Sequence, residues 1–233
     1  MTNPNGAILW EGPSPLDGQP LVLIVTGLAQ TTANEKTGNM LQTWILRADV
    51  DPLTAFKGPD GYSNCGNCIH RLQRSCYVRW YHAPLSIWHA YKRGSYTRML
   101  DLGLIRDRML RIGSAGDPAL VPPWVWEPLL AMAAGHTGYT HLWREPFAEP
   151  YRRLCQASCD GFQDYLDATA AGWKPFLVLP EGVPDPAGAV HCPSSKESGR
   201  VTDCATCALC DGDSAPVVIN AHGRSRSRVA LLN

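Results

Sequence analysis

The segment Met40–Arg47 reads M-L-Q-T-W-I-L-R, and the run Cys65–Tyr77, further along, reads C-G-N-C-I-H-R-L-Q-R-S-C-Y. The first segment is rich in residues that favour β-structure, and its partial alternation predicts a strand. A loop that contains Pro52 and Pro59 joins this strand to three closely spaced thiols. The strand and its cysteine-rich loop therefore form the first unit of the predicted core.

Strands and helices alternate through the rest of the core. The sequence predicts helices over Ala83–Gly94, Pro123–Ala134 and Asp160–Gly172, and strands over Asp107–Ile112, Gly138–Arg144 and Pro175–Leu179. Such alternation implies parallel pairing. We expect an α/β fold, with a partial or complete (β/α) barrel-like parallel sheet and a cysteine-rich, metal-binding C-terminal segment. Because sites gather at the carboxyl ends of parallel strands, the first cysteine loop and the turn Gly113–Pro118 should lie on the same face.

Three segments divide the chain. Residues 1–39 form an N-terminal lead-in and a first strand, in which Met1–Gln19 is irregular and Pro20–Leu28 is the strand. Residues 40–180 form the α/β core with the first cysteine cluster. Residues 181–233 carry the second cysteine cluster, a last strand over Ala215–Ala221 and a basic tail.

The composition is that of a globular protein. The 233 residues are 45% hydrophobic and 18% charged, with a formal net charge of zero, so no long-range field attracts nucleic acid. The chain lacks the roughly 18 to 20 consecutive apolar residues of a membrane span, and the apolar run Leu21–Leu28 follows no Lys or Arg. We expect a cytoplasmic protein with no membrane partner, in which paired cysteines indicate metal or redox chemistry rather than disulfides.

The first cysteine run offers three thiolates, Cys65, Cys68 and Cys76. Thiolates bind soft metals, and short spacings let them converge. Either His70 or His82 completes a zinc site, or the site keeps an open position, as in a [4Fe–4S] cluster with three protein ligands. The spacing alone slightly favours structural zinc.

The second run has a complete set of four ligands, Cys192, Cys204, Cys207 and Cys210. The C-x2-C-x2-C spacing resembles the iron–sulfur run of bacterial ferredoxins, and it is equally compatible with a zinc knuckle. Metal binding is indicated, and the identity of the metal stays open. Cys155 and Cys159 are interpreted as small buried hydrophobic residues.

Two motifs together resemble the first part of a radical S-adenosylmethionine enzyme barrel. They are C-x2-C-x7-C-Y-V after a predicted strand and R-I-G-S-A-G-D-P in the next unit, although the superfamily's usual cysteine spacing is C-x3-C-x2-C. The resemblance implies that Cys65, Cys68 and Cys76 bind the cluster. It also implies that Tyr77, Ser114, Gly116 and Asp117 bind the cofactor, and that Asp117 is a catalytic residue.

Most of the chain also resembles cysteine-rich hypothetical proteins of bacteriophage and prophage genomes. Those proteins share the Cys-Tyr pair, a following Ser-x-Gly-Asp and a late C…C-x2-C-x2-C. This resemblance implies the host-cell cytoplasm and a small-molecule, nucleotide or nucleic-acid substrate. The turn Gly113–Pro118 also has a simpler interpretation as a strand-to-helix connection, because Asp and Pro favour helix starts.

Three functional hypotheses remain open, and whether the protein is an enzyme remains open with them. The first is a radical S-adenosylmethionine-type enzyme. The second is a zinc-stabilised, base-exchanging enzyme resembling a transglycosylase, with Asp117 or Asp160 as nucleophile or base. The third is a zinc-stabilised protein that binds a host protein or DNA, with Arg224–Arg228 as a nucleic-acid contact.

Two further residues have structural interpretations from their positions. Asp160 opens a predicted helix, which favours a role as its N-cap. His141 lies on a predicted strand, where it lines a site if its side chain points to the carboxyl end of the strand, although packing in the core is the usual role of a histidine. The oligomeric state is not determined by the sequence.

Overall fold

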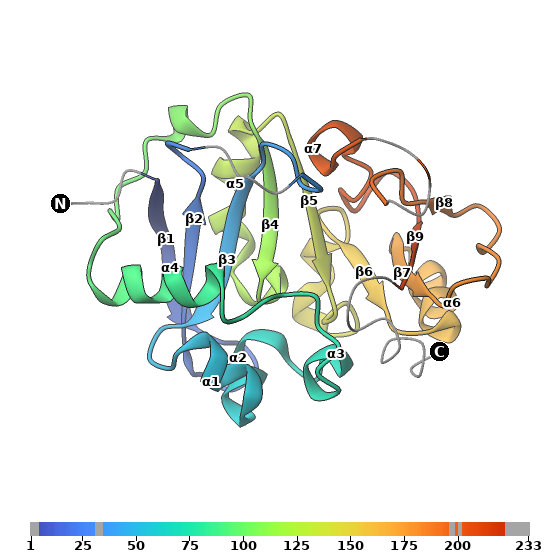
Figure 1. Ribbon diagram of the computed structural model, residues 1–233, viewed down its shortest axis with the longest axis horizontal. Helices are drawn as coiled ribbons and strands as arrows, with labels where there is room; N and C mark the ends of the chain where they lie inside the picture. The colour runs from blue at the N-terminus through green and yellow to red at the C-terminus, as the bar shows by residue number, and fades with distance from the viewer. Residues whose placement is uncertain (1–4, 31–34, 196–198, 200–201, 222–233) are drawn as a thin grey trace.

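A computed structural model describes residues 5–30, 35–195, 199 and 202–221. These residues form one sheet of nine strands in the order β1-β2-β3-β4-β5-β6-β7-β9-β8 (Figure 1). The strands are β1 Gly6–Pro13, β2 Pro20–Thr26, β3 Leu41–Arg47, β4 Met109–Ala115, β5 Gly135–Thr140, β6 Gln156–Cys159, β7 Pro175–Leu179, β8 Val190–His191 and β9 Val217–Asn220. The predicted α/β class is confirmed.

The sheet changes its pairing at β3. β1, β2 and β3 pair antiparallel, and every pair from β3 to the edge strand β8 is parallel. The two end strands, β1 and β8, do not pair with each other among the described residues. The sheet is open, so the alternative of a complete barrel is wrong.

The expected irregular lead-in is partly wrong, because β1 forms within it. β1 pairs with β2 from Gly6↔Thr26 to Pro13↔Pro20, with a register shift between Ile8 and Trp10. Its sequence, G-A-I-L-W-E-G-P, has Gly and Pro near its ends. An edge strand tolerates them, because only one of its sides must supply ladder hydrogen bonds.

Helices cover the two faces of the sheet unequally. The helices are α1 Pro52–Lys57, α2 Tyr62–Cys65, α3 Ile69–Leu72, α4 Ala83–Lys92, α5 Pro123–Met132, α6 Phe162–Ala170 and α7 Cys204–Cys207. On one face, Trp126 of α5 and Tyr165 of α6 belong to the larger core together with Ile112 and Leu177 of the sheet. Full burial of each such side chain contributes about 1.5 to 3 kcal/mol.

On the other face, α4 lies across β1–β3 (Figure 1). Ile87 and Ala90 of α4 pack with Ile24 and Trp44 of the sheet. Over β4 to β9, the strand residues on this face instead line a cavity. In the described part of the chain, no helix has the length and apolar character needed to cross a membrane.

Candidate functional site

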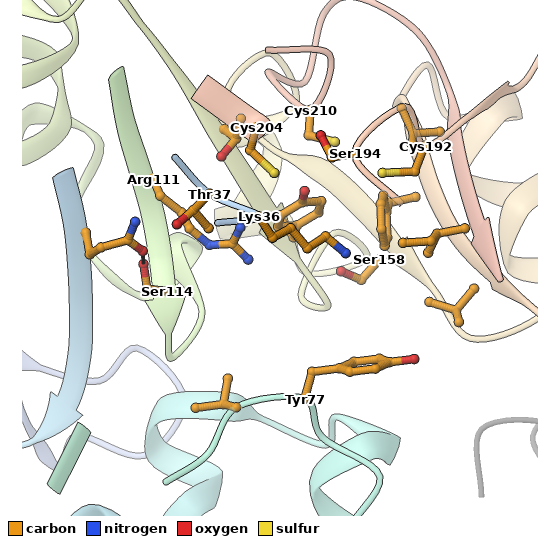
Figure 2. Close-up of a pocket in the computed structure, with 18 of the residues that line it drawn as sticks. Lys36, Thr37, Tyr77, Arg111, Ser114, Ser158, Cys192, Ser194, Cys204 and Cys210 are labelled. Atoms are coloured by element: carbon orange, nitrogen blue, oxygen red, sulfur yellow. Dashed lines mark hydrogen bonds between the residues drawn. The ribbon is translucent and has the colours of Figure 1, made fainter. Parts of the chain in front are cut away.

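A cavity of about 600 Å³ lies against the face of the sheet that α4 covers only in part. Figure 2 shows Tyr77 on one side of this cavity and Cys192, Cys204 and Cys210 on the opposite side, with Arg111 between them. The volume falls within the roughly 300 to 1,000 Å³ of small-molecule pockets. Segments from both cysteine runs therefore meet around one space.

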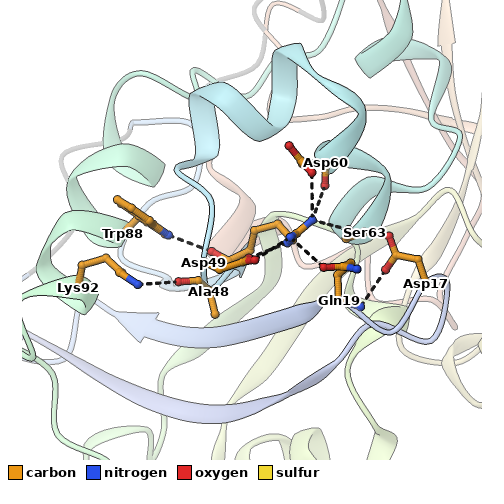
Figure 3. Close-up of polar contacts among 9 residues, drawn as sticks. Asp17, Gln19, Ala48, Asp49, Asp60, Ser63, Trp88 and Lys92 are labelled. Carbon is orange, nitrogen blue, oxygen red and sulfur yellow. Dashed lines mark hydrogen bonds and ion pairs between the residues drawn. The ribbon is translucent and has the colours of Figure 1, made fainter.

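Arg47, the last residue of β3, ties the first cysteine loop to the sheet. Its guanidinium donates two hydrogen bonds of 2.9 Å to Asp49, one of 2.9 Å to Ser63 and one of 3.2 Å to Gln19 (Figure 3). The hydrogen bonding of Arg47 to the Asp49 carboxylate is the main reason that the Arg47 pKa is raised. Because Ser63 lies in α2, these contacts fix the segment that ends at Cys65.

Three side chains of types that can ligate a metal meet at the carboxyl edge of the parallel strands. His141 follows β5, Asp160 follows β6, and His70 comes from α3. The Nε2 atoms of both histidines lie 3.2 Å from Oδ1 of Asp160. Within the described residues, this is the one group of three or more such ligand atoms that all lie within 4.8 Å of one another.

The same group is electrostatically coupled to Cys68. Burial opposes ionisation of Asp160, but hydrogen bonds from His141 and His70 outweigh it and hold the pKa of this carboxyl well below its usual range. Burial by itself would lower the pKa of His141. The interactions of His141 with Cys68 and Asp160 outweigh burial, so this pKa lies well above its usual value. Burial by itself would raise the pKa of the Cys68 thiol, but the interaction with His141 outweighs burial and lowers this pKa. Cys68 and His141 therefore each favour the charged form of the other, and Asp160 contacts the same imidazole.

Two interpretations from the sequence are corrected here. α6 begins at Phe162 after Gly161, so Asp160 is not its N-cap. His141 lines the cavity instead of packing only in the core. Both residues come directly after a parallel strand, and that position is the signal by which sequence reasoning could have grouped them.

The thiols of the first run interact electrostatically, but among the described residues they do not form a group whose ligand atoms lie within 4.8 Å of one another. Burial raises the pKa of Cys65, and the charges of Cys68 and Cys76 raise it further. Burial is also the main cause of the raised pKa of Cys76. Tyr77, next to Cys76, lines the cavity and is 44% exposed, so its ring is accessible to a ligand.

All four cysteines of the second run line the cavity. Burial raises the pKa of Cys210 to about 12, and the charges of Cys192 and Cys204 contribute. Backbone bonds hold this run in place, because Cys192 N–H donates to Val218 O at 2.7 Å and Cys204 N–H donates to Lys36 O at 2.8 Å. These sulfurs are near one another, but they do not reach the mutual spacing of the histidine–aspartate group.

Asp117 is placed inside the protein. It is 6% exposed, and its carboxylate accepts hydrogen bonds from Ala119 N at 3.0 Å, Thr140 Oγ1 at 2.7 Å and His141 N at 2.8 Å. Burial raises its pKa. The Asp117 carboxylate thus caps the short helix η3 (Pro118–Leu120) and positions the backbone of His141.

The turn that carries Asp117 fits closely against β3. Gly116 has φ +77°, and a Cβ atom there would lie 2.2 Å from the carbonyl oxygen of Ile45, so glycine is required. Asp117 N–H donates to Asn64 O at 3.0 Å, which joins this turn to the first cysteine loop as expected. Ser114 lines the cavity and donates to Gln42 Oε1 at 2.6 Å, whereas Gly116 and Asp117 are not among the described lining residues.

The remaining candidates have simple placements. His82 lines the cavity but is outside the His70 group. Cys155 and Cys159 are buried, as expected, at 0% and 3% exposure. The tail Arg224–Arg228 lies outside the described residues.

Comparisons of this chain with models of protein families, with curated proteins and with solved structures found no match. The chemistry of the cavity must therefore be argued from its own geometry.

Proposed function

We propose that this protein is an iron–sulfur enzyme of the radical S-adenosylmethionine type, in which Cys65, Cys68 and Cys76 bind the cluster. The main support for this proposal is the position of these thiols, which follow β3 in the chain. β3 is the first of six neighbouring parallel strands in the order β3-β4-β5-β6-β7-β9. A partial (β/α) barrel would have this strand order, and its reactive centre would lie at the carboxyl edge of the strands.

The donor chemistry of the first run fits a metal centre. Burial is the main cause of the raised pKa of Cys65, and the charges of Cys68 and Cys76 raise it further, so the neighbouring sulfurs oppose the ionisation of Cys65. A bound cationic centre removes this conflict by replacing the protons. Zn–S bonds of about 2.3 Å place the ligands of one zinc ion about 3.8 Å apart. Among the described residues no three thiols lie within 4.8 Å of one another, so either kind of centre would have to draw the thiols of the first run closer or be larger than one zinc ion.

When bound, the cluster would supply one electron that breaks a C–S bond of the S-adenosylmethionine sulfonium, releasing methionine and leaving a carbon radical that takes hydrogen from the substrate. The protein's own residues would prepare this reaction. His141 would donate a hydrogen bond to the Cys68 thiolate, which stabilises negative charge on the sulfur. Trp44, Phe176 and Val178 line the cavity and would exclude water.

The second run would hold a second centre on the opposite side of the cavity. Its four thiols match a complete ligand set for zinc or for an iron–sulfur cluster. A centre at this position would either pin the C-terminal segment to β7 and β9 or face the substrate directly.

Metal and sulfide analysis of protein purified without oxygen tests this proposal. We expect about four irons and four sulfides per cluster, with one cluster lost when Cys65, Cys68 and Cys76 are replaced by Ala. Cys155→Ala is the matched control, because Cys155 is a buried thiol outside both runs. With a reductant, the wild type should release methionine from S-adenosylmethionine and the triple variant should not. Zinc without iron, even after anaerobic reconstitution, would contradict the proposal.

The His70–His141–Asp160 group favours a second candidate, a mononuclear metal enzyme. Two histidines and one carboxylate leave coordination positions open for water or substrate, as in catalytic zinc and non-haem iron sites. Such a centre would suit the hydrolytic or base-exchanging alternative. His70→Ala and Asp160→Ala would then remove one divalent ion, while His82→Ala, a cavity residue outside the group, would retain it.

A further inference from the structure

Arg111 presents a guanidinium to the cavity, and among the described residues no hydrogen bond or ion pair is formed with it. It lies on β4, lines the cavity and is partly buried. Its guanidinium carbon lies 5.4 Å from the centre of the Tyr139 ring. Among the described residues, no hydrogen-bond acceptor or carboxylate pairs with the guanidinium, although guanidinium groups withdrawn from solvent are normally paired.

The neighbouring strand supplies a second unpaired polar group at the same place. Thr137 on β5 is the register partner of Arg111 and also lines the cavity. It is 1% exposed, and its hydroxyl oxygen has no hydrogen-bond partner among the described residues. A buried hydroxyl without a partner is costly, so both groups point to a ligand that would satisfy them together.

The remaining residues that line the cavity indicate the shape and polarity of the rest of that ligand. Trp44, Tyr77, Phe176 and Val178 give the cavity aromatic and apolar surfaces. In Figure 2, Arg111 and Tyr77 extend into the cavity from opposite sides. A matching molecule has an oxyanion at one end and a flat, largely apolar body, and a cavity of about 600 Å³ accepts one of nucleotide size.

We propose that Arg111 and Thr137 form an oxyanion subsite for the phosphate or carboxylate of a nucleotide-sized substrate. The guanidinium donates two parallel hydrogen bonds to the oxyanion, and the threonine hydroxyl donates a third. The reaction performed on this substrate depends on the proposed function, whereas binding at the subsite does not.

Calorimetric titration of the metal-loaded full chain tests the subsite. The probes are AMP, which combines an oxyanion with a flat body, adenosine, which has the body alone, and inorganic phosphate. Arg111→Met should weaken AMP binding about 10- to 100-fold and leave adenosine binding unchanged. Arg106→Met, which changes an exposed arginine outside the cavity lining, should bind AMP like the wild type.

Thr137→Val keeps the shape of the side chain and removes the unpaired hydroxyl. It should weaken AMP binding a few-fold and leave the melting temperature unchanged or higher. A large drop in melting temperature with unchanged AMP affinity would give Thr137 a purely structural role and overturn its place in the subsite. Unchanged AMP affinity in Arg111→Met, with loss of metal from the second cysteine run, would show that Arg111 instead balances thiolate charge, and would overturn the proposal.

A last titration shows whether the subsite binds an oxyanion of the substrate or the carboxylate of S-adenosylmethionine. If the subsite serves the substrate, Arg111→Met should bind S-adenosylmethionine as the wild type does, and AMP should bind beside it. If AMP excludes S-adenosylmethionine and Arg111→Met weakens both equally, the subsite holds the cofactor's carboxylate and the substrate assignment fails. Failure of the iron analysis or of methionine release would contradict the proposed reaction and leave these binding results intact.

Discussion

One face of the sheet has two halves with opposite character. Over β1–β3, Trp80 and Ile87 pack on strand residues and close the face. Over β4 to β9, Arg111, Thr137 and Ser158 occupy the corresponding inner positions and leave a cavity. The strands continue without a break, so the difference lies in the side chains and in what covers them. The covered half should therefore provide stability, and the open half should bind ligands.

The largest effect should come from the covered half. Trp80 is 4% exposed and stacks on Phe56 with ring centres 5.4 Å apart. Trp80→Ala should lower the free energy of unfolding by about 3 to 5 kcal/mol, because it leaves a large cavity. Trp124→Ala is the control, since Trp124 is 63% exposed. Urea denaturation measures both, and similar losses in the two variants would refute the distinction between them.

Asp117→Ala tests whether the Asp117 carboxylate stabilises the fold where the covered half and the open half of the face meet. The change leaves the amides of Ala119 and His141 and the hydroxyl of Thr140 without their acceptor, and should cost about 3 kcal/mol. Asp101→Ala removes one exposed bond to Gly103 and should cost about 1 kcal/mol or less. A stable Asp117→Ala protein that has lost only activity would instead favour a catalytic role for Asp117.

The stability changes caused by Arg47→Met and Arg111→Met should differ between the two halves of the face. Arg47 is 4% exposed and bonded to Asp49, Ser63 and Gln19, so Arg47→Met should cost about 2 to 3 kcal/mol in chemical denaturation. Arg111→Met should change stability by no more than about 0.5 kcal/mol, because the described residues offer its guanidinium no acceptor. A larger loss from Arg111→Met would mean that the open half also depends on its cation for folding.

The smallest effect concerns pH. Burial lowers the pKa of His136, whose Nε2 lies 3.0 Å from Leu154 O. The unfolded chain binds a proton below about pH 6.5, whereas the folded chain resists it, so this histidine makes stability fall as pH decreases from that value. Unfolding measured from pH 7.5 to 5 should depend less on pH in His136→Gln than in the wild type. His89→Gln, an exposed change on α4, is the control, and an unchanged slope in His136→Gln would exclude His136 as the source.

Parts of the fold were predictable because local pattern dominates there. β2, β3, β7 and α4 were found within a few residues, since apolar runs and helix-start prolines mark them. β6 and β8 were missed, because strands of four and two residues are too short to show a period. The first cysteine loop lies beside the turn Gly113–Pro118, as predicted, because the two segments follow β3 and β4, which are adjacent parallel strands.

The assembly of the site was less predictable. His70 was among the expected ligands, but its meeting with His141 and Asp160 joins residues from three separate segments. Local rules gave Asp160 a capping role, which is reasonable for an aspartate before a helix. Its contact with His141 depends on the adjacency of the parallel strands β5 and β6, and its contact with His70 depends on where α3 lies.

The sequence by itself determined the α/β class, the parallel core and the two thiol-rich segments, because strand periodicity and cysteine spacing are local properties. Tertiary structure alone decided that the sheet stays open and that Asp117 is buried while Asp160 faces the cavity. It also decided that Arg111 and Thr137 lie side by side with no hydrogen-bond partner for their side chains in the described part of the chain. These outcomes depend on strand order and on which face a helix covers. Both are set by contacts between residues far apart in the chain, so no local pattern can specify them.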